Sequence, residues 1–348
     1  MVASQQVSNG SGCSPGEIRI NRIETWSDHE LTAFGAMMRR RTKDSPWKGR
    51  WDLGDVYYRW KFAGNPLGPA LMFGAWQGDE LLGSFSLCPV AFERGGQRLK
   101  GGELGDIYVE ERLRGHGVFR RMVLAMATAA RDEAFELVFC VPNAAGYKAL
   151  LGTGEFLAAP RAARKLCVLP LSFRRFGPSV LKTLDPIWQL LIGVRFGRDS
   201  DPVSFEWQAL QQQTGAGDVR AVFDPAHRIG EYPDPSRYKI VGRQNAWAIT
   251  KETEHSGRRF LMIGALSAPS LAERRAVLHS LIRQAARDGY DAIALWIHRD
   301  DLLATIRPTM PFLPADSKDF VFLKTPCAEA VAASGARVEI DLIHTDKI

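Results

Sequence analysis

The sequence predicts a mixed α/β fold made of two tandem units of similar design, the second of which is degenerate. Three observations lead to this prediction. A strand-like run is followed by a glycine loop and a long helical pattern, a β-hairpin pattern precedes that run, and part of the arrangement recurs later in the chain. Strands that alternate with helices in this way indicate a sheet that contains parallel strands.

The glycine loop spans Arg112 to Phe119, between an apolar run, Leu104 to Val109, and a helical pattern that begins near Gly117. Glycines allow the backbone to approach a ligand closely, and the N–H groups of such a turn can point at an anion. The positive end of the following helix adds to this attraction. The spacing fits neither a P-loop nor the G-x-G-x-x-G dinucleotide loop. The pattern therefore predicts a phosphate-binding loop of another kind.

Strand patterns flank this loop unit on both sides. Upstream, residues 70–76 and 81–87 are apolar, and the short polar segment between them predicts a β-hairpin. Downstream, residues 137–141 predict a buried strand, which is followed by Pro142-Asn143 and by residues 147–156.

The motif R-x-x-G-x-G, formed by Arg112, Gly115 and Gly117, resembles the acetyl-CoA signature of the GNAT acyltransferase superfamily. The hairpin before the motif and the strand and Gly-Phe ending after it follow the same order as in that family. The resemblance therefore covers roughly residues 17–156. It implies acyl-CoA as a co-substrate, no permanently bound cofactor, and a primary amine as the acceptor.

Part of this unit recurs in the second half of the chain. The segment Ala129-Ala-Arg-Asp132 returns as Ala285-Ala-Arg-Asp288, an offset of 156 residues, and a buried strand follows each copy. Each copy is also preceded by a strand pattern. Two β–α–β units of equal size predict a duplicated domain.

The second copy lacks the residues of the phosphate-binding loop. At the same offset, the arginine and the two glycines of the motif are replaced by Ala268, Leu271 and Glu273. A glutamate at a helix start would repel a phosphate group. We therefore expect two tandem GNAT-like domains, of which the second keeps the fold and has lost CoA binding.

These patterns divide the chain into four segments. Residues 1–16 are polar and predict a disordered tail, and residues 17–160 form the expected catalytic GNAT domain. Residues 161–237 form a linker, and residues 238–348 form the degenerate GNAT-like domain.

The linker contains an amphipathic helical pattern that begins after Asp185, a candidate helix cap, and runs to Val194. Its apolar face would be formed by Ile187, Trp188, Leu191 and Ile192. The sequence leaves three roles open for this face: packing between the two domains, lying on a membrane surface, or lining an apolar substrate groove.

The resemblance assigns a nearly continuous set of residues to acyl-CoA. The loop and helix start would hold the pyrophosphate, and backbone N–H groups of the preceding strand would hold the pantetheine arm and polarise the thioester carbonyl. An asparagine further along would bond the pantetheine amide or simply cap a helix. These residues are Ile107, Tyr108, Val109, Arg112, Arg114, Gly115, His116, Gly117, Val118, Phe119 and Asn143.

Proton transfer needs groups of its own, beginning with a base for the acceptor amine. Glu103 and Asp106 are three residues apart, which places them on opposite faces of an extended strand. We prefer Asp106, because it lies nearer the point where the family's strand splays. The tyrosine that protonates the leaving thiolate in this family would fall at Leu150. Either Tyr147, one helical turn after Asn143, takes this role, or a free thiol leaves with the help of solvent.

Composition limits the classes of partner. The net charge of +6 suits polyanionic CoA or an anionic membrane surface, but the basic residues form no stripe with stacking aromatics, so no nucleic-acid partner is expected. Five cysteines form no C-x-x-C pair, and no metal site is expected. No signal peptide is visible, and no run reaches the ~18–20 apolar residues of a membrane span. We expect a cytoplasmic protein, with contact at the inner face of the cytoplasmic membrane and the oligomeric state left open.

An aromatic-rich segment before the hairpin bears on the acceptor. It contains Trp51, Tyr57, Tyr58, Trp60 and Phe62. Such side chains can stack on a sugar, line an acyl groove or form core. A W-K-x-x-x-N-P-x-G pattern, from Trp60 to Gly68, resembles tandem acyltransferases of bacterial envelope biosynthesis.

Several functions follow from these patterns. The acceptor would be a long-chain amino alcohol, a sphingoid base that becomes a ceramide-type lipid, or an amino sugar of surface polysaccharide. The apolar linker favours the lipid slightly. A CoA-binding module without turnover and a peripheral membrane protein are alternatives from other classes.

Overall fold

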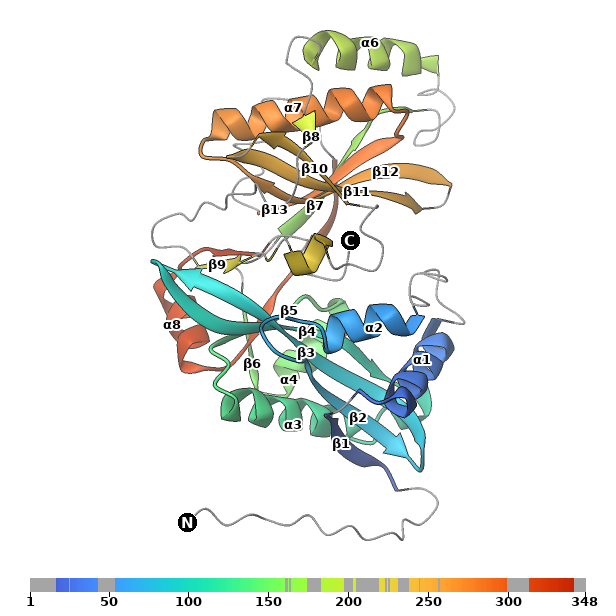
Figure 1. The fold of residues 1–348 in the computed structure, drawn as a ribbon, viewed down its shortest axis with the longest axis vertical. Coiled ribbons are helices and arrows are strands. Elements are labelled where there is room, and N and C mark those ends of the chain that lie inside the picture. Colours follow the sequence, from blue (N-terminus) through green and yellow to red (C-terminus); the bar gives the residue numbers. More distant parts are fainter. Residues whose placement is uncertain are drawn as a thin grey trace.

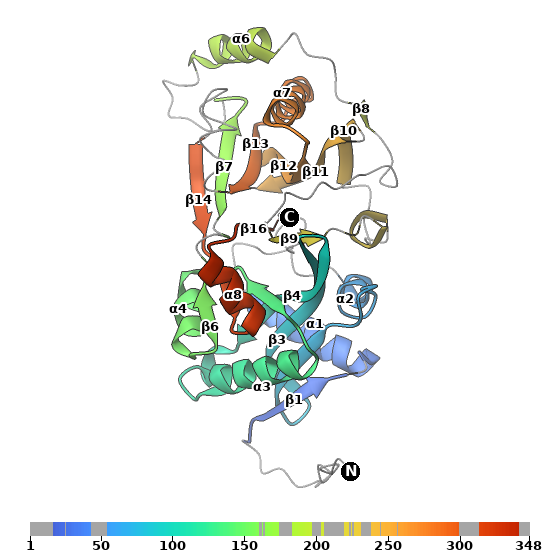
Figure 2. The same cartoon turned by 90° about the vertical axis from the view of Figure 1, so that its left-hand side faces the viewer.

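The structure is a computed structural model, and it describes most of the two expected domains. The described residues are 17–24, 26–42, 54–159, 162, 164–173, 183–196, 203–204, 219–222, 224, 226–230, 238–243, 245–255, 257–298 and 313–340. The expected tail, residues 1–16, and Trp51 lie outside them. Two sheets, each covered by helices, follow one another along the long axis of the molecule (Figures 1 and 2).

The first sheet contains nine strands within the described residues, seven of them in one continuous path. In spatial order these are β1 (Arg19–Ile23), β2 (Leu71–Gln77), β3 (Glu80–Arg94), β4 (Gln97–Val109), β5 (Leu137–Cys140), β15 (Val321–Leu323) and β6 (Phe156–Ala158). The other two are β9 (Val219–Val222), which pairs with the end of β3, and β16 (Val338–Glu339), which pairs with β9.

The second sheet contains seven strands within the described residues. In spatial order they are β14 (Leu313–Lys318), β7 (Arg164–Pro170), β13 (Ala292–His298), β12 (Arg258–Ser267), β11 (Ala246–His255), β10 (Tyr238–Arg243) and β8 (Val203–Ser204).

Helices cover both faces of the first sheet. The helices are α1 (Asp28–Thr42), α2 (Gly54–Phe62), α3 (Val118–Asp132), α4 (Ala144–Gly152), α6 (Asp185–Phe196), α7 (Leu271–Arg287) and α8 (Pro326–Ser334). There are also two short helical turns, η1 (Glu111–Leu113) and η4 (Ala226–Gly230). Side chains of α3 and α4 share a core on one face, whereas α1, α2 and α8 contribute to cores on the other. The second sheet is covered by α7.

The predicted duplication is confirmed. In each domain a helix connects two parallel strands, β4–α3–β5 in the first and β12–α7–β13 in the second. The predicted hairpin is also present, as β2 and β3. The two sheets have matching strand orders, which is the arrangement expected of two tandem GNAT-like domains.

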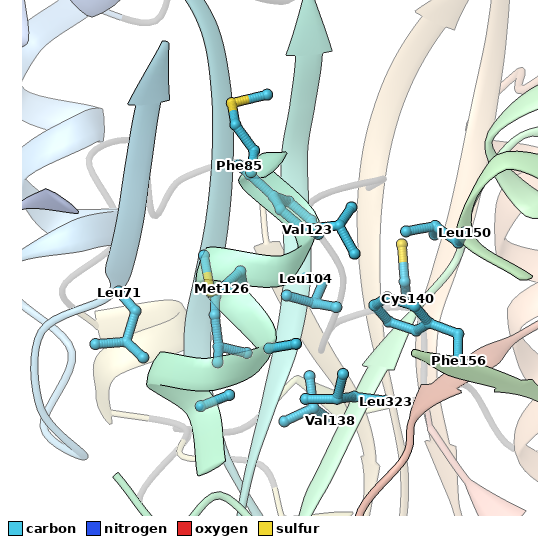
Figure 3. Close-up of a cluster of buried hydrophobic side chains, with 14 of the residues drawn as sticks. Leu71, Phe85, Leu104, Val123, Met126, Val138, Cys140, Leu150, Phe156 and Leu323 are labelled. Carbon is cyan, nitrogen blue, oxygen red and sulfur yellow. The ribbon is translucent and has the colours of Figure 1, made fainter. Parts of the chain in front are cut away.

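Several elements cross between the two domains, which the expected boundaries did not anticipate. Besides the two strands described next, β9 from the expected linker and α8 and β16 from the expected second domain belong to the first sheet and its cores. β7 follows the first domain in the chain, yet it lies between β13 and β14 of the second sheet. In return β15, from the second half of the chain, lies between β5 and β6 of the first sheet. Figure 3 shows Leu323 of β15 beside Val138 in the first core, where both side chains are fully buried. Burial of this apolar strand explains why it crosses to the other sheet.

The linker helix α6 packs on the outside of the second domain. Trp188 and Ile192 face the second core, whereas Ile187 and Leu191 are more than half exposed, so the expected apolar face is divided between core and surface. α6 contacts α7 and lies at the outer end of the molecule (Figure 1). Packing between the two domains is therefore not its role.

Candidate active site

The helix α3 begins without a side-chain cap. Its N-cap residue is Gly117, whose φ of 73° is left-handed and which has no side chain to bond the first turn. Gly115, two residues earlier, also has a positive φ, 83°. Both conformations strain any residue with a Cβ, so the glycines of the motif are needed for the path of the backbone.

In this conformation several backbone amides of the loop and the first turn of α3 have no carbonyl acceptor within the described residues. Among the described residues, no backbone carbonyl accepts a hydrogen bond from the amides of Gly115, Gly117, Val118, Phe119 or Arg120. Free first-turn amides and the helix dipole together form an anion site. The geometry predicted for a phosphate loop is therefore present.

The charged groups of the loop are not equivalent. The guanidinium of Arg112 lies 2.7 Å from a carboxylate oxygen of Glu80 and 3.1 Å from one of Glu110. Its hydrogen bond with Glu80, in particular, raises the pKa of Arg112. Arg40 of α1 also bonds Glu110, at 2.6 Å. Arg112 therefore anchors the loop to the hairpin turn and, through Glu110, to α1.

Three other basic residues lie around the free amides and form no ion pair with a carboxylate of the described residues. Arg114, His116 and Arg120 are all exposed, and Arg114 donates only to the carbonyl of Val109, at 3.3 Å. Arg120, in the first turn of α3, was not singled out from the sequence, because it lies outside the R-x-x-G-x-G motif.

Strands β4 and β5 separate beside this loop. Their parallel pairing begins at Gly101–Leu137 and ends at Leu104–Cys140, although β4 continues to Val109. The backbone of residues 105–109 therefore has no partner on the β5 side. A separation of this kind provides room and unpaired amides for an extended ligand between the two strands.

Asp106 lies in this unpaired part of β4, in an unusual conformation. Its φ is 45°, one of three positive values at non-glycine residues in the described chain. Such a conformation costs about 1–3 kcal/mol and persists only where surrounding contacts hold it. The contacts here are a 2.6 Å ion pair with Lys61 of α2, a 3.1 Å hydrogen bond from the Ser86 hydroxyl, and a hydrogen bond from the Ser84 hydroxyl to the backbone carbonyl.

The Lys61–Asp106 pair is buried, since the exposed fractions of the two side chains are 6% and 4%. A buried charge pair is costly to form and contributes little net stability, so its presence at a strained residue suggests a functional reason. Lys61, Ser84 and Ser86 were not identified from the sequence. Lys61 stood in the W-K-x-x-x-N-P-x-G pattern, which was the available signal.

Glu103 and Asp106 lie on the same face of the sheet, and the expectation of opposite faces is wrong. Glu103 pairs in register with Cys88, whose side chain belongs to the core under α1 and α2, and Asp106 reaches Lys61 of α2. The reason is a register shift between Ser84 and Ser86, a β-bulge that adds a residue to β4 and changes the alternation.

The two carboxylates differ in their position along β4. Glu103 lies where β4 is paired on both sides, with Cys88 and with Phe139. Asp106 lies beyond the last β4–β5 pair. The structure therefore brings Asp106, rather than Glu103, to the opening between the strands.

The residues after β5 have two structural roles: Asn143 caps a helix, and Tyr147 and Leu150 pack in the first core. Asn143 caps α4, because its side chain accepts a 2.7 Å hydrogen bond from the Gly146 amide. Leu150 is fully buried in the first core, and Tyr147 is partly buried against the same core. The Tyr147 amide donates to the Asn143 carbonyl at 2.8 Å, which places the two residues one turn apart, as expected.

Tyr108 is a second phenol near the opening. Burial raises its pKa, and the Arg41 guanidinium lies 5.5 Å from the centre of its ring. The phenol therefore keeps its proton at neutral pH. The sequence analysis had assigned Tyr108 to CoA binding through its backbone alone.

The aromatic residues of α2 form core. Tyr57, Tyr58, Trp60 and Phe62 are at most 9% exposed, and they stack on one another and on residues of α1 and its approach. Trp60 also stacks on His227 of η4 and donates to its carbonyl at 3.0 Å.

The helix α7 of the second domain corresponds to α3, but a side chain caps its first turn. Ser270 caps α7 by accepting from the Glu273 amide at 3.2 Å, and the Glu273 carboxylate accepts from the Ser270 hydroxyl at 2.7 Å. Ser270 and Glu273 have the spacing of a capping box, with the glutamate bonded to the serine hydroxyl, and we call this pair the capping box below. Its carboxylate lies where a phosphate would have to bind.

Two further properties concern the described residues only. No group of histidine, cysteine, aspartate or glutamate side chains among them could hold a metal ion. None of the helices seen in the described parts of the chain is long and apolar enough to cross a membrane.

Comparison with known proteins supports the acyltransferase interpretation. Residues 18–152 match the family model of the acetyltransferase (GNAT) domain. No protein of curated function matches the chain.

Solved structures show the same fold over most of the chain, at low sequence identity. The chain is 16% identical to Eis1 from Mycobacterium abscessus, with a TM-score of 0.57 over 91% of this chain and 76% of that one. A GCN5-related N-acetyltransferase from Anabaena variabilis is 13% identical, with a TM-score of 0.56 over 87% of this chain and 72% of that one. Saccharomyces cerevisiae N-myristoyltransferase with bound myristoyl-CoA is 10% identical, with a TM-score of 0.54 over 91% and 80%.

The family match covers the open helix start, the separated strands and the buried Lys61–Asp106 pair. Acyl-CoA is the co-substrate that GNAT domains use. Residues 18–152, most of the first domain, thus match the GNAT acetyltransferase domain, a family of acyl-CoA-dependent N-acyltransferases.

Proposed function

We propose that the chain transfers a long acyl group from acyl-CoA to the primary amine of a long-chain amino alcohol, a ceramide-type N-acylation. The acceptor would be a sphingoid base of the bacterial envelope, met at the inner face of the cytoplasmic membrane. The observation that carries the proposal is that β4 joins all parts of the site. The strand leads to the free amides before α3, it separates from β5, and it carries the buried Asp106.

The open start of α3 would hold the CoA end of the co-substrate. The amides of Gly115, Gly117 and the first turn of α3 would bind the pyrophosphate, with Arg114, His116 and Arg120 as exposed charges around it. Arg112 would hold the loop in place through Glu80 and Glu110. Backbone N–H groups of residues 107–109 would then bind the pantetheine arm and the thioester oxygen.

Proton transfer would use Asp106 as the base for the amine and a tyrosine as the acid for the thiolate. The acceptor ammonium gives a proton to the Asp106 carboxylate, and the free amine attacks the thioester carbon. The C–N bond forms, the C–S bond breaks, and the CoA thiolate takes a proton from Tyr147 or Tyr108. The second proton of the amine nitrogen then returns to that phenolate, the neutral amide is released, and Asp106 gives its proton to solvent. Lys61 and Ser86 hold the Asp106 carboxylate in position during these events. Glu103 is the less favoured base, because it lies in the closed part of the sheet.

The burial of the aromatic residues of α2 bears on the choice of acceptor. Stacking on exposed aromatic rings is a common way to bind sugars, but Tyr57, Tyr58 and Trp60 are buried in the core. The main argument for an amino sugar is thereby weakened. A fold of this kind also accommodates a long acyl-CoA, since yeast N-myristoyltransferase was solved with myristoyl-CoA bound.

The test is CoA release by the purified chain, measured with palmitoyl-CoA and sphinganine, and separately with acetyl-CoA and glucosamine. We expect release with the first pair. Asp106→Asn should lower kcat by about 10²–10⁴-fold while CoA affinity stays unchanged, because only the base is lost. Glu103→Gln is the matched comparison, and its loss should be much smaller.

Other results would contradict parts of the proposal. Release only with acetyl-CoA and glucosamine would identify an amino-sugar N-acetyltransferase. A larger loss in Glu103→Gln than in Asp106→Asn would exchange the roles of the two carboxylates. CoA binding without release with either acceptor would contradict both acceptors and favour a CoA-binding module.

A further inference from the structure

Four charged side chains beside the glycine loop form one connected network. Arg112 of the loop lies 2.7 Å from Glu80, at the start of β3, and 3.1 Å from Glu110. Arg40 of α1 contacts the same two carboxylates, at 3.5 Å and 2.6 Å. We call these four residues the brace. The brace ties the loop before α3 to the hairpin β2–β3 on one side and to α1 on the other.

Glu110 is the central member of the brace. Its side chain is 14% exposed, whereas those of the other three members are between 38% and 52% exposed. Its amide donates to the Leu82 carbonyl at 2.8 Å, and its carbonyl accepts from the Leu113 amide at 2.9 Å. Glu110 therefore connects the end of β4 to the turn η1, which leads into the loop. A single exposed ion pair contributes little, but a carboxylate that holds two guanidinium groups can fix the backbone around it.

The carboxylates of the brace have an unfavourable charge for a site that binds a polyanion. Repulsion between Glu110 and a pyrophosphate bound at the start of α3 would lower the affinity for CoA. The same carboxylates also engage Arg112, the arginine of the R-x-x-G-x-G motif, which could otherwise turn toward a phosphate. Such carboxylates favour CoA binding only if fixing the loop gains more than the repulsion costs.

The second domain has apolar residues where members of the brace would be. At the 156-residue offset Glu110 corresponds to Leu266, and Arg112 corresponds to Ala268. Glu110 lies outside the R-x-x-G-x-G motif, so its replacement is an observation separate from the loss of the glycines. The brace and the open helix start thus occur together in the first domain, and both are replaced in the second.

We propose that Glu110, assisted by Glu80, is a positioning residue for CoA binding, which holds Arg112 and the loop so that the free amides stay directed at the pyrophosphate. Arg112 is then a member of the brace and not a ligand of the phosphate. The proposal rests on CoA binding at the start of α3, as proposed above, and is independent of the acyl acceptor.

The experiment is isothermal titration of the wild-type chain and its variants with CoA. Glu110→Gln should weaken CoA binding by about fivefold to tenfold, although it removes a negative charge beside the site. Glu80→Gln should act in the same direction but less strongly, because this carboxylate is more exposed. Glu110→Asp keeps the charge and should bind CoA more tightly than Glu110→Gln. Thermal melting would show that each variant is folded.

Glu111→Gln is the matched control, because it removes the same charge one residue further along the chain. The Glu111 side chain is exposed and forms no ion pair within the described residues. With only repulsion to lose, this variant should bind CoA as well as wild type or up to about twofold more tightly. Opposite effects of the same charge change at neighbouring residues would therefore separate positioning from simple electrostatics.

Two other results would contradict different parts of this inference. If Glu110→Gln also bound CoA as tightly as wild type or more tightly, the positioning role would be wrong, and Arg112 would be a phosphate ligand that the carboxylates restrain. If the wild-type chain did not bind CoA, the CoA site at the start of α3 would itself be wrong, and the positioning role with it.

Discussion

The starts of α3 and α7 occupy the same place in two domains of the same design, yet they differ in every chemical respect. The first is preceded by two left-handed glycines and leaves its amides free. The second is closed by the Ser270–Glu273 capping box. Under the 156-residue offset Val118 corresponds to Arg274, but α7 begins already at Leu271. An added turn of helix has replaced the glycine loop.

This difference shows which residues preserve a fold and which preserve a site. Both helices keep their apolar stripe against a sheet, and both join parallel strands. The packing of the core therefore does not depend on which residues form the start of the helix. A duplicated GNAT domain can exchange its phosphate loop for a stronger helix without disturbing its packing.

The largest effect is expected from copying the second helix start into the first. The variant Gly117→Ser with Arg120→Glu introduces the capping-box pattern at α3. A carboxylate would then compete for the free amides and replace a cation, so CoA affinity should fall about 100-fold or more. Isothermal titration with CoA measures this change.

Lys239→Glu is the charge-matched control for that variant, because it reverses an exposed lysine on the second sheet. Its CoA affinity should stay close to that of wild type. If the α3 variant also kept its affinity while remaining folded, the free amides would not be the phosphate site.

A smaller effect is expected when the second helix start is opened. Ser270→Ala removes the cap of α7 and should lower the free energy of unfolding by about 1 kcal/mol. Chemical denaturation measures the loss. Titration should still give one CoA per chain, because the added helical turn remains. A second binding site in this variant would show that the capping box alone closes the second domain.

The smallest effect is expected at a polar cluster of the second domain, in which Arg259 and Tyr290 both donate hydrogen bonds to the Glu252 carboxylate. Hydrogen bonds from Arg259 and then Tyr290 lower the pKa of Glu252, and burial is the main cause that raises the pKa of Tyr290 to about 12. Because the pKa of Glu252 is lower in the folded protein, its stabilisation is fully present above the ordinary glutamate pKa of 4.5 and is lost as the pH falls through the folded pKa.

Glu252→Gln should therefore lower the free energy of unfolding at neutral pH by less than about 1 kcal/mol, because the Glu252–Arg259 ion pair is partly exposed. A slightly lower melting temperature would report this loss. The difference from wild type should shrink as the pH falls below 4.5. CoA affinity should not change. A difference that grew at low pH would assign the stabilisation to another group.

Local patterns predicted the elements that depend on nearby residues. The hairpin, the β–α–β units, the duplication and the glycine loop before α3 are encoded by apolar periodicity and by glycines at fixed spacing. The bulge at Ser84–Ser86 could not be predicted, because a single added residue leaves no trace in the apolar pattern. The face of Asp106 was missed for that reason, and its partner Lys61 with it.

The strand exchange could not be predicted for a different reason. β7 and β15 are short apolar strands that fit either sheet, and only the packed cores decide between them. The division of α6 into an inner and an outer face likewise depends on α7, which lies about 80 residues further along the chain.

The exchange of β7 and β15 also sets the order in which the protein can mature. The gap between β5 and β6 is filled only when residues 321–323 have left the ribosome, well after both of those strands have been made. Until then the nascent catalytic domain exposes two unpaired strand edges, which are sites of aggregation. The second domain is thus a permanent partner in folding, and its loss would leave the first sheet unfinished even though every group proposed for catalysis lies in the first domain.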